Sequence, residues 1–78
     1  MNHYKKAIKY VRENRTWSDA QEQAALEKIN LYRCDISFAC PEIADEINDF
    51  MEEYGQDNDL NEGWWLEYGN VDDIFFAL

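Results

Sequence analysis

Residues 41–55, PEIADEINDFMEEYG, predict the clearest helix of the chain. Its apolar side chains recur with the spacing of one helical face, at Ile43, Ile47, Phe50, Met51 and Tyr54. Pro41 is well suited to the first position of a helix, and Gly55 stands where a left-handed C-terminal cap is usual. We therefore expect a helix that begins at residue 41 or 42 and ends at Gly55.

The opposite face of this helix is acidic. At about 100° per residue, its carboxylates fall within an arc of about 120°. We call this set the acidic ridge: Glu42, Asp45, Glu46, Asp49, Glu52 and Glu53. Acids one turn apart lie about 5.4 Å apart along the axis, a linear charge density broadly comparable with that of a phosphate backbone. The ridge is either an ordinary solvated face or a surface that attracts a basic or nucleic-acid-binding partner.

Two further helices are expected before this one. Residues 2–14 place an apolar stripe on one side of a helix, at Tyr4, Ala7, Ile8 and Val11. Ser18 and Gln21 then form a capping-box pattern, which predicts a second helix over residues 19–32. The apolar face of that helix is expected at Ala25, Leu26, Ile29 and Tyr32.

The C-terminal segment WWLEYGNVDDIFFAL, residues 64–78, contains two short apolar clusters rich in aromatic residues. They predict strands over residues 64–68 and 74–78, joined by a turn around Gly69 and Asn70. A hairpin is marginal alone, so one of its faces must pack on the helices. The expected fold is therefore α+β: three helices packed against a C-terminal β-hairpin.

The competing interpretation of this segment is a short helix that begins after Asn70, with Asn70 as its cap and Asp73 at its third position. In either case residues 74–78, IFFAL, are too apolar to be solvated, and Phe75 or Phe76 should be buried. The whole chain, residues 1–78, is expected to form a single small domain, because a chain of this length has no room for a second core.

The two adjacent tryptophans are a candidate contact feature. On a strand, Trp64 and Trp65 point to opposite faces, so one is expected in the core and the other at the surface. An exposed tryptophan rimmed by Glu62 and Glu67 would be a suitable anchor for a partner.

Charge is divided unevenly along the chain, which carries a formal net charge of −10. Residues 1–33 hold all seven cations and four acids, a net charge of +3, whereas residues 34–78 hold thirteen acids and neither Lys nor Arg. Either the basic part folds onto the acidic part, or the acidic part binds a partner. Direct nucleic-acid binding is not expected, because the acidic part repels phosphate.

The segment DNDLNEG, residues 57–63, resembles a cation-binding loop in part. Asp57, Asp59 and Asn61 alternate like the first three ligand positions of an EF-hand, but Glu62 and Tyr68 occupy the positions that require glycine and glutamate. A noncanonical cation-binding loop is therefore one interpretation, and a solvated turn stabilised by Asn and Asp side chains is the plainer one.

The residue types needed for catalysis are not arranged in a recognisable set. His3 is the sole histidine, and Asp35 and Glu42 oppose ionisation of the nearby thiols of Cys34 and Cys40. These three side chains are also fewer than the four ligands of a structural zinc site. We therefore expect no enzyme activity, no cofactor and no metal. No apolar run reaches the roughly 18 to 20 residues that span a bilayer, so a cytoplasmic protein without membrane contact is expected.

The sequence thus favours a non-catalytic protein-interaction or regulatory module. Its expected contact residues come from the acidic ridge and the tryptophan pair: Glu42, Asp45, Glu46, Asp49, Glu53, Trp64 and Trp65. The partner is expected to be a protein, basic or nucleic-acid-binding. One alternative is a nucleic-acid mimic that binds a DNA- or RNA-handling protein through the ridge, and another is a cation-binding loop protein.

Overall fold

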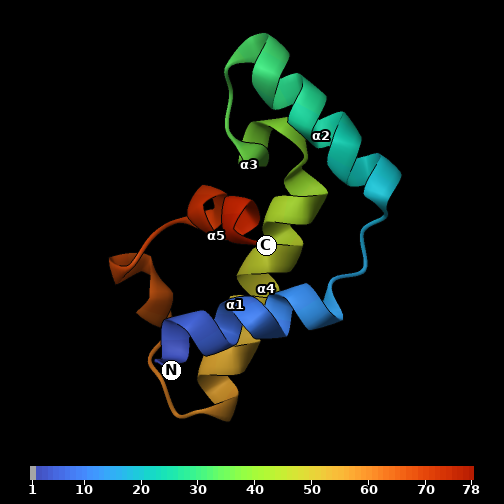
Figure 1. The fold of residues 1–78 in the computed structure, drawn as a ribbon. Helices are drawn as coiled ribbons and strands as arrows, with labels where there is room; N and C mark the ends of the chain where they lie inside the picture. Colours follow the sequence, from blue (N-terminus) through green and yellow to red (C-terminus); the bar gives the residue numbers. More distant parts are fainter. Residues whose placement is uncertain (1) are drawn as a thin grey trace.

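The computed structural model describes residues 2–78, and every regular element in that range is helical (Figure 1). The elements in chain order are α1 (His3–Asn14), α2 (Asp19–Tyr32), α3 (Ile36–Ala39), α4 (Pro41–Asp57), the 3-10 turn η1 (Trp64–Glu67) and α5 (Val71–Ala77). The ranges predicted for the three longer helices are confirmed to within two residues. The short helix α3 lies in a segment for which the sequence predicted no element.

The prediction of an α+β fold with a C-terminal β-hairpin is wrong. Gly63 adopts a left-handed φ of 71°, and the chain turns at once into η1. Asn70 and Asp73 then form a reciprocal capping box: the Asp73 amide donates to Asn70 Oδ1 at 3.1 Å, and the Asn70 amide donates to Asp73 Oδ2 at 2.9 Å. The competing interpretation, a helix capped by Asn70, is confirmed.

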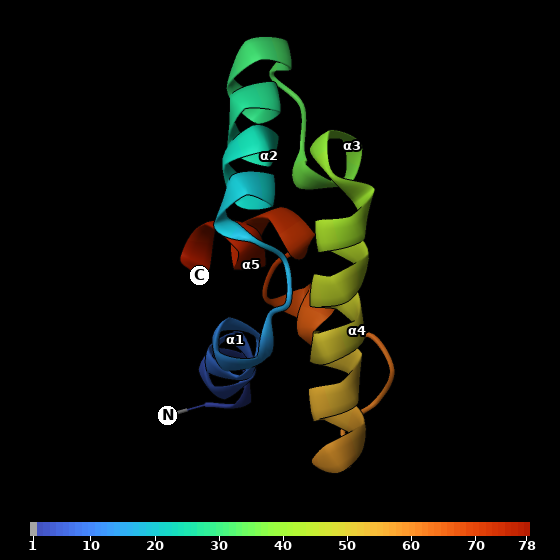
Figure 2. The same cartoon turned by 90° about the vertical axis from the view of Figure 1, so that its right-hand side faces the viewer.

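Helix α4 is the element around which the others assemble. Helices α1, α3 and α5 and the turn η1 all contact it. Figure 2 shows α5 between α2 above and α1 below, with α4 running along one side of α5 and α1 and with α3 beside α2. The largest fully buried side chains come from every element except α2, and they are Val11, Ile36, Ile43, Ile47, Met51, Trp65 and Ile74. The core therefore lies along one face of α4.

Helix α2 is held less tightly than the others. Ala25 is its one fully buried residue, and α2 packs mainly on α3. Ser18 accepts a hydrogen bond from the Gln21 amide at 3.1 Å, as the capping pattern predicts, but the Gln21 side chain lies toward the Cys40 thiol instead of returning to the cap. Because α2 extends beyond the core, the molecule is elongated, with principal extents of 39 × 22 × 20 Å.

The terminal cap predicted at Gly55 is also wrong, because α4 continues to Asp57. A Cβ atom on Gly55 would lie 2.6 Å from both Cδ1 and Nε1 of Trp64. The indole rests directly on the helix backbone there, and its Nε1 donates to the Met51 carbonyl at 3.1 Å. Glycine is required at this position for close packing, and the left-handed residue after the helix is Asp59, with φ of 58°.

Candidate functional site

The acidic ridge lies on the face of α4 away from the core, but two of its carboxylates bind other parts of the chain. Glu46 accepts hydrogen bonds from the Thr16 amide at 2.6 Å and from the Thr16 hydroxyl. Glu52 accepts from the Gly63 amide and from the Trp65 indole, each at 2.9 Å. Both side chains are half-buried. Glu46 holds the connection between α1 and α2, and Glu52 holds the connection between α4 and η1.

The remaining four carboxylates of the ridge are exposed. We call them the acidic row: Glu42, Asp45, Asp49 and Glu53. At a rise of about 1.5 Å per residue they extend over about 16 Å of the helix. The ion pairs found among residues 2–78 join Lys9 to Glu13 and Arg15 to Glu22, and neither includes a member of the row.

The cations of α1 form no ion pair with the acidic row. Helix α1 does pack on α4, but through aromatic contacts such as the edge-to-face pair of Tyr10 and Phe50, whose ring centroids are 5.7 Å apart. Arg12 donates to the carbonyls of Ala77 and Leu78 at 3.0 and 3.3 Å, where a cation is favoured by the dipole of α5. The packing of the basic segment on the acidic one therefore neutralises little of the row by direct pairing.

At each end of the row, local interactions shift the pKa of a side chain. The pKa of Glu42 is lowered, first by a hydrogen bond from its own backbone amide, then by the Cys40 thiol, with a further contribution from the charge of Lys28. At the other end, the pKa of Tyr10 is raised, first by a hydrogen bond with Glu53, then by burial and by the nearby carboxylates. Glu42 is thus held in its charged form at neutral pH.

Neither tryptophan stands free at the surface. Trp65 is 1% exposed and lies in the core, so it cannot touch a partner in this fold. Trp64 is half-buried and packs against Tyr54 at a centroid distance of 5.8 Å. The expectation of an exposed tryptophan arose from the alternation of a strand, and this alternation is lost because residues 64–67 form a 3-10 turn.

Sequence reasoning missed a group of exposed apolar side chains at the far end of α2 and on α3. Leu31 is 73% exposed, Tyr32 63% and Phe38 72%, and we call these three residues the apolar shelf. Tyr32 was expected on the apolar face of its helix, but α2 extends past the core before reaching it. The one signal for this group in the sequence was Phe38, an aromatic residue between Cys34 and Cys40 that belongs to no predicted element.

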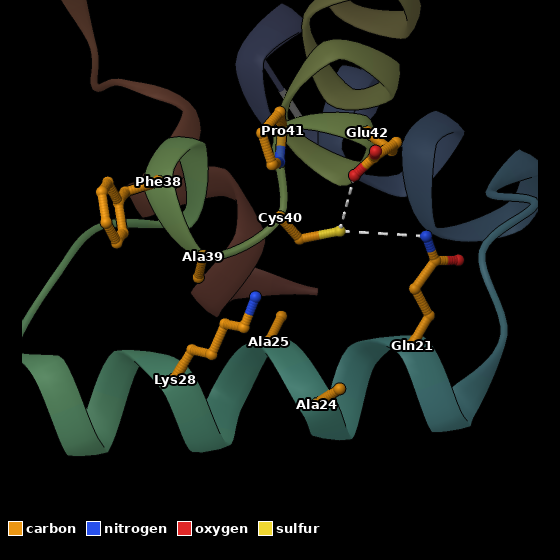
Figure 3. A pocket seen from close by; sticks show the side chains of 9 residues that line it. All are labelled: Gln21, Ala24, Ala25, Lys28, Phe38, Ala39, Cys40, Pro41 and Glu42. Carbon is orange, nitrogen blue, oxygen red and sulfur yellow. Dashed lines mark hydrogen bonds between the residues drawn. The ribbon is translucent and has the colours of Figure 1, made fainter.

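Two hollows adjoin the shelf. One, of about 270 Å³, is lined by Tyr32, Cys34 and Phe38. The other, of about 310 Å³, lies between α2 and the junction of α3 with α4, and it extends from Phe38 to Glu42 (Figure 3). The Cys40 thiol in this second hollow donates to Glu42 at 3.4 Å and accepts from Gln21 at 3.8 Å, so its hydrogen-bonding groups are satisfied within the chain.

The structure adds no support for a metal site. Asp57 is the last residue of α4, and Asp59 lies in the turn beyond it. Across residues 2–78, no three His, Cys, Asp or Glu side chains gather in a way that could hold a metal ion. Within the same residues, no helix has both the length and the apolar character needed to cross a membrane.

Comparisons of the chain with models of known protein families, with curated proteins and with solved structures found no match.

Proposed function

We propose that this protein is a non-catalytic interaction module that binds a basic protein partner through the acidic row. The observation that carries the proposal is the exposure of Glu42, Asp45, Asp49 and Glu53 without an ion-pair partner among residues 2–78. Residues 34–78 contain no Lys or Arg that could approach them.

The row opposes the stability of the helix that bears it. Asp45 and Asp49, and again Asp49 and Glu53, are like charges four residues apart, and each such pair disfavours a helix by about 0.2–0.5 kcal/mol. Glu53 also lies toward the C-terminal end of α4, where the helix dipole disfavours an acid. Cations of a partner would relieve this repulsion, and the field of the row would accelerate their association.

A nucleic-acid mimic is the second candidate function. It is favoured by the linear arrangement of the row along one helix, with consecutive carboxylates about 4.5 to 6 Å apart along the axis. A DNA- or RNA-handling protein that tracks a phosphate backbone would meet a similar series of negative charges.

The test is capture of partners from native cell extract at low and high salt, with the row neutralised. The row variant carries Glu42→Gln, Asp45→Asn, Asp49→Asn and Glu53→Gln. The matched control removes the same number of charges from exposed acids away from α4, with Glu27→Gln, Asp59→Asn, Glu62→Gln and Glu67→Gln. We expect the row variant to lose a salt-sensitive partner that the control retains. Retention by the row variant would refute the proposal.

The two candidates are separated by adding excess duplex DNA or RNA to the captured complex. A mimic shares its binding site with nucleic acid, so the partner should be released. If the partner stays bound while the row variant still fails to capture it, mimicry is excluded and the interaction module stands.

A further inference from the structure

The apolar shelf and the first residue of the acidic row are joined by a shared hollow. Phe38 lines both hollows. It lines the first together with Tyr32 and Cys34, and the second extends from it to Glu42, the first residue of the row. Figure 3 shows Phe38 at one end of that second hollow and Glu42 toward the other, with Pro41 between them on the same side. A partner bound along the row would therefore meet the shelf at the N-terminal end of α4.

The shelf is apolar surface left without cover by the fold. Leu31, Tyr32 and Phe38 make up half of the large apolar side chains that are strongly exposed in residues 2–78. Adjoining exposed apolar side chains of this size, rimmed by polar residues, are typical of a contact site. The hollow of about 270 Å³ between Tyr32 and Phe38 is lined by apolar side chains and Cys34, and it suits an apolar side chain of a polypeptide.

The charge of the surface indicates which kind of polypeptide would bind there. A second copy of this chain also carries −10, so two copies repel each other at long range. A segment with Lys or Arg is instead attracted by the row. Lys28 lines the hollow between Phe38 and Glu42, and Arg33 follows Tyr32 at the end of α2, so the basic part of a partner is repelled there and points toward Asp45 and Asp49.

We infer that the partner is a basic polypeptide segment with an apolar anchor next to its cations. The anchor occupies the hollow between Tyr32 and Phe38, and the cations lie along Asp45 and Asp49. This inference rests on the proposed function and adds to it the chemistry and the orientation of the partner.

The test uses two synthetic labelled peptides. Both are amphipathic helices with a lysine on each turn of one face; one carries a leucine a turn beyond the first lysine, and its twin carries serine there. Fluorescence anisotropy measures the Kd of each with the unmodified protein. Burial of the leucine predicts that the leucine peptide binds about tenfold more tightly than its twin.

Two variants of the protein locate the anchor. Phe38→Ser should abolish the difference between the peptides, whereas Leu66→Ser should leave it unchanged, because Leu66 is also exposed, at 58%, but lies on η1. Tyr32→Ser is the second variant at the hollow and should act like Phe38→Ser. Circular dichroism checks that each variant keeps its helical content.

Each outcome decides a separate point. Equal binding of the twins to the unmodified protein, with salt dependence, would leave the proposed function standing and overturn the inference. Binding of neither peptide would count against the proposed function itself. A preference for leucine that survives both Phe38→Ser and Tyr32→Ser would overturn the inference, as would a dimer in sedimentation that these substitutions dissociate, since the occupant would then be a second copy.

Discussion

The carboxylate of Glu52 accepts a hydrogen bond from the indole nitrogen of the buried Trp65 at 2.9 Å. The same carboxylate accepts from the Gly63 amide, also at 2.9 Å. A residue that belongs to the acidic ridge by sequence therefore holds the α4–η1 connection in place. Its charge serves the fold, whereas the charges of the acidic row remain available to a partner.

Glu52→Ala should lower the free energy of unfolding by about 1–3 kcal/mol, because it leaves the Trp65 indole and the Gly63 amide without their acceptor. Asp49→Ala is the matched control, since Asp49 is an exposed acid of the same helix. It should not lower the free energy of unfolding, because it removes the like-charge pairs with Asp45 and Glu53. Urea denaturation followed by tryptophan fluorescence measures both. Equal effects of the two substitutions would contradict the role of Glu52 as a structural acceptor.

Gly55→Ala should destabilise the protein by about 1–3 kcal/mol through overpacking, although alanine favours a helix by about 1 kcal/mol over glycine. The added methyl would lie 2.6 Å from the Trp64 ring. Gln56→Ala, at the adjacent exposed position, should be close to neutral. Combining Gly55→Ala with Trp64→Leu should cost less than the sum of the two changes, because Trp64→Leu removes the ring with which the new methyl clashes. Strict additivity in thermal denaturation would show that the clash is absent.

Asn70→Ala should cost about 0.5–2 kcal/mol, because it removes the side-chain acceptor at the start of α5. Asn70→Ser keeps an oxygen that can accept from the Asp73 amide and should retain most of the stability. Chemical denaturation distinguishes the two variants. If Asn70→Ala leaves stability unchanged, the capping bond contributes little, and packing of Ile74 and Phe75 alone maintains α5.

Alkaline pH should destabilise the protein through Tyr10. Its pKa is raised above the ordinary value of 10.0, chiefly by the hydrogen bond with Glu53. The folded state therefore keeps a proton that the unfolded state loses, so this contribution is complete below the unfolded pKa and is lost as pH rises through the folded pKa.

Tyr10→Phe removes that titration, and the decline in stability between about pH 9 and pH 11 should become shallower. Tyr32→Phe is the control, because Tyr32 is exposed and lies away from the contact between α1 and α4. The free energy of unfolding in urea, measured at each pH, gives the slope. A slope that is the same for Tyr10→Phe and the unmodified protein would contradict the assignment.

The three longer helices and the division of charge can be predicted from the sequence alone. Periodicity over twelve or more residues and local end signals, such as Ser18 before α2 and Pro41 at the start of α4, act within a few residues of one another, so they can be read without tertiary information. The position of the acidic ridge follows from the same periodicity.

The conformation of the C-terminal segment and the composition of the candidate site depend on tertiary contacts. Segments as short as Trp64–Glu67 and Val71–Ala77 are marginal as isolated helices, and they are stable here because Trp65, Ile74 and Phe75 are buried against the rest of the core. The same packing requires glycine at residue 55, buries Trp65 and engages Glu46 and Glu52. Contacts between residues distant in sequence decide which carboxylates remain free. Local sequence patterns do not reveal those contacts.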